Sequence, residues 1–69
     1  MKWLDRGWNV SSSRVGSFTV TVQPDRDSTY KLDVNGVVAA KRWGTILEAK
    51  LAAPKIVKAW LTKALVELD

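Results

Sequence analysis

The 69-residue chain contains no cysteine and no histidine. Without cysteine it can form no disulfide and can offer no thiolate to a zinc ion. Without histidine it lacks the usual general base at neutral pH, and neither a Ser-His-Asp nor a Cys-His nucleophile system is available. Its four glycines are scattered and form no phosphate-binding loop. We therefore predict that the protein is not an enzyme and that it has no metal and no cofactor.

Long apolar runs are also absent from the sequence. None approaches the roughly 20 residues that a membrane-spanning helix needs. The opening stretch MKWLDRGW is too highly charged for a secretory signal. These features predict a cytoplasmic protein with no membrane contact. At this length we expect residues 1–69 to form a single domain, near the lower limit for folding on its own core.

The net charge of +4 is unevenly distributed along the chain. The segment 41–63 contains six basic residues and a single acid, Glu48. Such a basic block attracts phosphate groups or an acidic protein surface. It is equally compatible with the solvated side of a helix, and the sequence leaves both interpretations open.

The most readable stretch is 29–43, in which Asn35-Gly36 lies between two runs of β-branched and aromatic residues. This dipeptide predicts a two-residue type I′ hairpin, because both turn positions need positive φ. A two-residue turn also fixes the register, with Val34 opposite Val37, Leu32 opposite Ala39 and Tyr30 opposite Lys41. The alternation places Tyr30, Leu32 and Trp43 on one side of the hairpin, which should point into a core.

A further strand is predicted over 17–23, where Phe18, Val20 and Val22 alternate with polar residues. The loop 24–28 joins it to the hairpin, so that three antiparallel strands form a meander. Residues 2–4 and 8–10 are interpreted as two short strands separated by a bend at Arg6-Gly7. Residues 11–13, three serines, are interpreted as a loop or a frayed edge, because small polar side chains pack little.

The C-terminal third is predicted to be a helix that covers the sheet. Thr45 and Glu48 have the spacing of a helix capping box. Apolar residues then recur at helical spacing and predict a buried stripe: Ile46, Ala49, Ala53, Val57, Trp60 and Ala64, widened by Leu61, Leu65 and Leu68. Pro54 interrupts this pattern, at a cost of roughly 3 kcal/mol inside a helix. We predict an α+β fold, an antiparallel β-meander of three to five strands packed on one face by a C-terminal helix kinked or broken at Pro54.

Binding is the function class that these exclusions leave. The residues predicted to contact a partner are cations and uncommitted tryptophans: Trp3, Arg6, Trp8, Arg14, Lys31, Arg42, Lys50, Lys55 and Lys58. Cations on the open sheet face and on the helix suit a nucleic-acid backbone, whereas exposed tryptophan beside arginine is typical of a protein interface. Tyr30 and Trp43 are expected on the covered face, which weakens a base-stacking platform. Asp33 is expected to form a cross-strand charge pair with Lys31 and Arg42.

Several motifs follow one another along most of the chain: Trp8, Gly16-Ser-Phe-Thr-Val, Tyr30-Lys-Leu, Asn35-Gly36 and Thr45-Ile-Leu-Glu-Ala-Lys50. This succession resembles a group of short phage and prophage proteins that have a β-meander followed by a helix. The resemblance implies an accessory protein that acts by binding a host complex, in the host cytoplasm if a phage encodes it. Some proteins of this kind inhibit host defence, among them anti-CRISPR proteins, by occluding a surface without catalysis.

The order of strands and helix is also similar to the second half of a double-stranded-RNA-binding domain, with Glu48-Ala-Lys50 echoing its final helix. That family has a first helix and a pair of lysines at the start of the last one, and here Thr45-Ile46-Leu47 stands in their place. Our first hypothesis is a non-catalytic, phage-type inhibitor of a host defence nuclease complex. The alternatives are a direct nucleic-acid-binding protein and a structural homo-oligomer.

Overall fold

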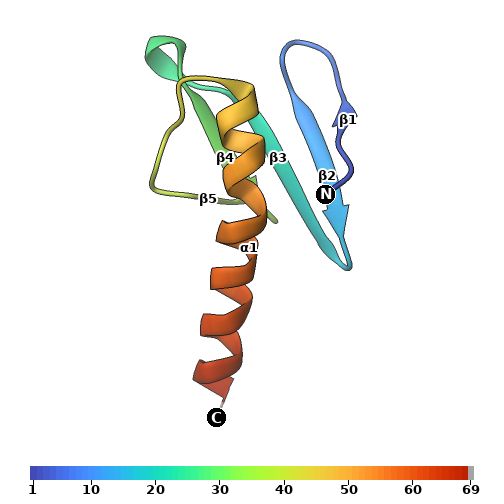
Figure 1. Cartoon of the computed structure of the whole chain (residues 1–69), viewed down its shortest axis with the longest axis vertical. Helices are drawn as coiled ribbons and strands as arrows, with labels where there is room; N and C mark the ends of the chain where they lie inside the picture. The colour runs from blue at the N-terminus through green and yellow to red at the C-terminus, as the bar shows by residue number, and fades with distance from the viewer. Residues whose placement is uncertain (69) are drawn as a thin grey trace.

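A computed structural model describes residues 1–68, and the side chains of residues 1–67. The chain forms a five-stranded sheet and one long helix (Figure 1). In chain order the elements are β1 (Leu4–Asp5), β2 (Ser11–Val15), β3 (Phe18–Pro24), the 3₁₀ turn η1 (Arg26–Ser28), β4 (Tyr30–Val34), β5 (Val37–Val38) and α1 (Ile46–Leu68). Each strand pairs antiparallel with the next, in the order β1-β2-β3-β4-β5. The helix packs on one face of this meander, so the predicted α+β fold is confirmed.

The hairpin between β4 and β5 turns at Asn35-Gly36, as predicted. Both residues have positive φ, 52° and 89°, which is the requirement of a type I′ turn. Val34 lies opposite Val37, in the predicted register. The Asn35 side chain accepts a hydrogen bond from the backbone N–H of Thr19 at 2.8 Å, and the Asn35 N–H donates to the Thr19 carbonyl at 2.9 Å. The turn is therefore tied to the neighbouring strand β3 as well as to its own hairpin.

The predicted register fails farther from the turn, because Tyr30 lies opposite Trp43 and not opposite Lys41. The Ala39 N–H still donates to the Leu32 carbonyl, but residues 40–42 then loop out of the ladder. The chain returns at Trp43, which exchanges two backbone hydrogen bonds with Tyr30 (2.8 and 3.0 Å). The partner of Tyr30 is thus shifted by two residues. Because side chains alternate between the two faces with a period of two, this shift leaves Trp43 on the predicted face, and Trp43 is buried as the sequence predicted.

The N-terminal segment differs most from the prediction. Ser11–Ser13 belong to β2, an interior strand between β1 and β3, and all three serines are buried. Trp8 and Asn9, predicted to begin a strand, instead lie in the turn that joins β1 to β2. The reason is strand pairing, which outweighs the weak preferences of serine. Ser11 and Ser12 pair with both β1 and β3, and Ser13 pairs with β3.

Among the described side chains, those of residues 1–67, burial of the serines leaves one polar atom without a hydrogen-bond partner, the hydroxyl oxygen of Ser13. The Ser12 hydroxyl, by contrast, accepts from Arg6 Nε at 2.8 Å. An unpaired buried hydroxyl costs roughly 1–3 kcal/mol.

We expect Ser13→Ala to raise the free energy of unfolding by about 1 kcal/mol in urea denaturation. The matched variant Ser12→Ala should not stabilise the protein, and a loss of stability in Ser13→Ala would mean that its hydroxyl is hydrogen-bonded in solution.

The core lies between the sheet and the first half of α1. Its buried residues are Val20, Val22, Leu32, Val34, Ala39, Trp43, Ala49, Ala53 and Val57. The small side chains of Ala49 and Ala53 are fully buried, so the helix backbone lies close to the strands. At its start, the Thr45 hydroxyl accepts from the Glu48 N–H at 3.1 Å, which is one half of the predicted capping box.

The helix continues unbroken through Pro54, so the predicted alternative of two helices is wrong. Pro54 is exposed and removes one internal hydrogen bond, but the buried residues on both sides of it hold the helix to the sheet. The predicted stripe is buried only as far as the sheet reaches. Ala64 and Leu65 are exposed, because α1 runs past the end of the strands (Figure 1). The side chain of Leu68 lies outside the described residues.

Within residues 1–68, no helix has the length and the apolar character that crossing a membrane requires.

Candidate functional site

The nine residues predicted to contact a partner do not form a single site. Strand pairing places Arg14 and Lys31 on the outer face of the sheet, which we define as the face turned away from α1. Lys50, Lys55 and Lys58 lie on α1, which covers the opposite face. A single flat ligand cannot contact both groups, so the predicted combination of sheet cations and helix lysines is divided between two sides of the molecule.

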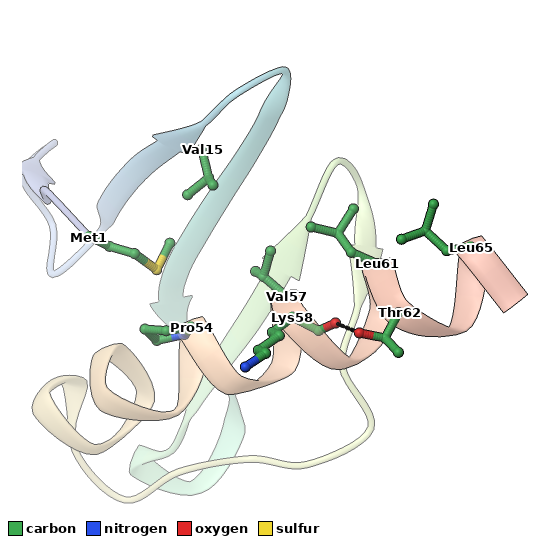
Figure 2. Close-up of a pocket in the computed structure, with 8 residues that line it drawn as sticks. All are labelled: Met1, Val15, Pro54, Val57, Lys58, Leu61, Thr62 and Leu65. Carbon is green, nitrogen blue, oxygen red and sulfur yellow. Dashed lines mark hydrogen bonds between the residues drawn. The ribbon is translucent and has the colours of Figure 1, made fainter.

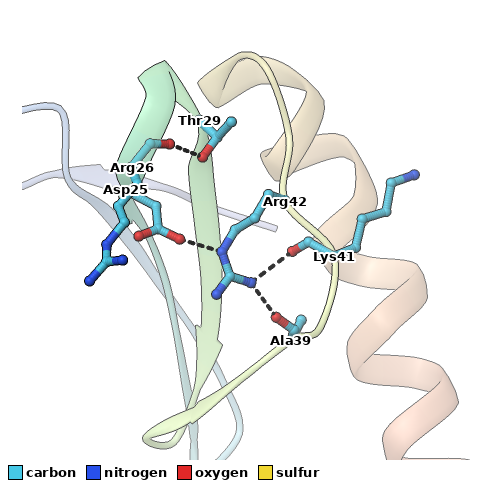
Figure 3. Close-up of polar contacts among 6 residues, drawn as sticks. All are labelled: Asp25, Arg26, Thr29, Ala39, Lys41 and Arg42. Atoms are coloured by element: carbon cyan, nitrogen blue, oxygen red, sulfur yellow. Dashed lines mark hydrogen bonds and ion pairs between the residues drawn. The ribbon is translucent and has the colours of Figure 1, made fainter.

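Arg42 is engaged in contacts within the chain (Figure 3). Its Nε donates to the Asp25 carboxylate, and its Nη1 donates to the carbonyls of Ala39 at 2.7 Å and Lys41 at 3.2 Å. The bond from Arg42, and after it a backbone hydrogen bond from Arg26, lower the pKa of the Asp25 carboxyl. These contacts fix the looped-out residues 40–42 against η1. Arg42 therefore has a structural role.

Asp33 does not form the predicted ion pair with Lys31 and Arg42. Its carboxylate accepts from the Gly36 N–H at 2.6 Å, and this contact closes the hairpin turn. Arg42 instead bonds to Asp25, which is 17 residues away in sequence. Short-range spacing could not reveal that partner.

Three of the four tryptophans pack against the core. Trp43 is buried, and Trp3 and Trp60 are half-buried against the core cluster. Lys50 Nζ lies 5.7 Å from the centre of the Trp3 ring, which places both of these predicted contact residues on the helix side. Trp8 is different, because 93% of its surface is exposed. It is the tryptophan that is free to meet a ligand.

A hollow of about 450 Å³ lies beside β1 and β2. We call it the basic hollow, and its lining residues are Lys2, Leu4, Arg6, Ser12, Ser13, Arg14 and Thr19. Three of them are cations and none is a carboxylate. The hydrogen bond from Arg6 Nε to the Ser12 hydroxyl orients the guanidinium group. Its terminal N–H groups make no hydrogen bond to protein atoms of residues 1–68, so they can donate to a ligand.

The electrostatics of the basic hollow favour an anion. Like charges gathered at one place repel one another, and a bound anion offsets that repulsion. Arginine is suited to phosphate, because its planar group can donate two parallel hydrogen bonds. The hydroxyl of Thr19 adds a neutral donor at the rim. The chemistry available here is recognition of a phosphate-bearing ligand.

Sequence reasoning found Arg6 and Arg14 but missed Lys2 and Ser12 as members of one site. Lys2, Leu4 and Arg6 recur at every second position in and beside β1, which is the spacing of residues on one side of an extended chain and a signal that the sequence does contain. The sequence analysis did not predict strand β2. Because residues 11–13 were interpreted as a loop, the pairing of Arg14 with Thr19 could not be foreseen.

A second, apolar groove of about 280 Å³ lies between α1 and the end of β2 (Figure 2). Its lining residues are Met1, Val15, Pro54, Val57, Lys58, Leu61, Thr62 and Leu65. Figure 2 shows Val15 and Met1 on one side and the side chains of α1 on the other. Leu65 is 66% exposed at the open end. Its lining is mostly apolar, and an exposed apolar patch can mark a surface that contacts a partner.

No three Asp or Glu side chains come together in a way that could hold a metal ion within residues 1–68. Searches for related proteins gave no match to any family profile, to any curated protein or to any solved structure.

Proposed function

We propose that this protein is a non-catalytic nucleic-acid-binding protein and that it uses the outer face of its sheet around the basic hollow. The observation that supports this proposal best is the gathering of Lys2, Arg6 and Arg14 around one hollow with no carboxylate in its lining. Lys31 adds a fourth cation on the same face. Phosphate contacts of this kind supply most of the affinity of sequence-independent binding.

The outer face is better suited to this role than the helix lysines. Lys55 and Lys58 are exposed, but they lie on a convex helix surface, and Lys58 also borders the apolar groove. The basic hollow is concave and contains hydroxyl groups, and an internal hydrogen bond already orients Arg6. A preorganised donor loses less conformational freedom on binding.

Titration with DNA and RNA over a salt series tests the proposal. Each phosphate contact contributes a slope of about 0.7 for single strands and 0.9 for duplexes in a plot of log affinity against log salt. Three contacts predict that the affinity falls roughly 20-fold for a single strand and roughly 40-fold for a duplex between about 50 and 200 mM salt. Fluorescence anisotropy of a labelled oligonucleotide measures this. Absence of binding at the lowest salt concentration would contradict the proposed function.

The apolar groove supports a second candidate function, which is binding of a protein partner. Exposed Leu65 continues the core stripe beyond the sheet, where this chain does not cover it. Inhibition of a host defence nuclease complex, a phage origin and a cytoplasmic location remain predictions that belong to this candidate. Binding of a protein partner becomes the better-supported function if the titration shows no nucleic-acid binding.

A further inference from the structure

Trp8 combines two unfavourable features. Its indole is 93% exposed, so a large apolar surface faces water. Its φ is +55°, between Gly7 at +78° and Asn9 at +59°, so three successive residues are left-handed. This conformation is a genuine outlier for a bulky side chain and stores strain. Neither the exposed indole nor the left-handed backbone at Trp8 contributes to the core. Together they leave the indole facing the solvent.

The turn that contains Trp8 is held in place by hydrogen bonds. The Gly7 N–H donates to the Asp5 carboxylate at 2.9 Å, and the Val10 N–H donates to the Gly7 carbonyl at 2.9 Å. The Arg6 N–H donates to the Val10 carbonyl at 2.8 Å, which closes the base of the turn. These hydrogen bonds hold the backbone of the turn in the conformation that exposes Trp8. A ligand would therefore meet an indole whose backbone is already ordered.

Trp8 is also close in sequence to a residue that lines the basic hollow. Arg6, two residues before it, lines the hollow and bonds to Ser12. We propose that Trp8 stacks on an unpaired base of a single-stranded nucleic acid whose neighbouring phosphates occupy the basic hollow. Alternation of an aromatic ring with cations is the common arrangement for binding single strands, because every base offers a flat face to an indole.

This inference rests on the proposed function and narrows it to single strands. In a duplex both faces of each internal base are already stacked, and the ring of Trp8 can reach only the terminal pair or the backbone. Single-stranded DNA or RNA with free bases should therefore bind more tightly than a duplex of equal length. The stacking itself does not distinguish ribose from deoxyribose.

The test compares the natural protein with Trp8→Ala on three probes, which are oligothymidine, oligouridine and a blunt-ended duplex of the same length. We expect Trp8→Ala to lose roughly 5- to 150-fold in affinity for the single strands and to lose much less for the duplex, where only the two terminal pairs offer a free face. Trp8→Phe should retain most of the single-strand affinity. Asn9→Ala, in the same turn, is the matched control and should bind like the natural protein.

The outcomes separate this inference from the proposed function. Salt-dependent binding that Trp8→Ala leaves unchanged on the single strands would overturn the stacking role and leave the proposed function intact. An equal loss on all three probes would also overturn it, because a duplex offers a free face only at its two terminal pairs. Binding to none of the probes would contradict both, and the surface would then serve a protein partner. Thermal unfolding of each variant verifies that the fold is retained.

Discussion

A variant with both Arg6→Glu and Arg14→Glu is expected to lose roughly a hundredfold or more of its affinity for nucleic acid at low salt. Each arginine lines the basic hollow and can donate to a phosphate oxygen. A hydrogen bond to a charged group contributes about 1.5–3 kcal/mol, so loss of two such bonds costs about 3 kcal/mol or more. Each glutamate also adds repulsion of the phosphate. Anisotropy titration at the salt concentrations used for the natural protein measures the loss.

The matched control is the double variant Lys55→Glu and Lys58→Glu. It lowers the net charge from +4 to zero, as the arginine variant does, but it changes the helix side. Long-range attraction alone predicts equal losses in the two variants, whereas a localised site predicts a loss only in the arginine variant. A greater loss in the helix variant would move the binding surface to α1. Because Arg6 also bonds to Ser12, the single variant Arg14→Glu is included, since the Arg14 side chain forms no hydrogen bond or ion pair within the described residues.

The largest expected effect on stability comes from Leu32→Ala. Leu32 is fully buried and is among the largest side chains in the centre of the core. Truncation of a buried leucine costs roughly 2–5 kcal/mol, because the transfer energy is lost and a cavity remains. A domain of this length has a total stability of roughly 3–10 kcal/mol. We therefore expect the melting temperature to fall by at least about 10 °C, or the protein to be unfolded at room temperature.

Leu51→Ala is the matched control, since Leu51 is 67% exposed on α1. The same chemical change there should alter the free energy of unfolding by no more than about 0.5 kcal/mol. Circular dichroism during thermal and urea unfolding measures both variants. Equal effects of the two substitutions would mean that the helix does not cover Leu32 in solution.

The local elements could be predicted from the sequence because short-range physics determines them. Asn35-Gly36 tolerates the positive φ of its turn, and the alternation of Val20 and Val22 marks one buried face. The hydroxyl of Thr45 caps the helix. Each of these signals lies within a few residues of its consequence, and so the meander, its inward face and the start of α1 all follow from spacing alone.

Tertiary structure determined what spacing could not. Ser11–Ser13 became an interior strand because two neighbouring strands pair with it. The partner of Arg42 is Asp25, which the loop 40–42 brings to it. The helix extends past its sheet because local helical preference does not depend on the length of the strands it covers.

For the candidate site, too, the sequence determined some features and the tertiary structure determined the others. Trp8, Arg6 and Arg14 were visible in the sequence as charged and aromatic residues without a place in the core. The grouping of Arg6 and Arg14 around one hollow depends on the pairing of β1 with β2 and of β2 with β3. Residue types thus determined which chemistry the protein can offer. Strand pairing over long sequence distances determined which of those groups meet, because contacts between distant segments depend on the packing of the whole chain.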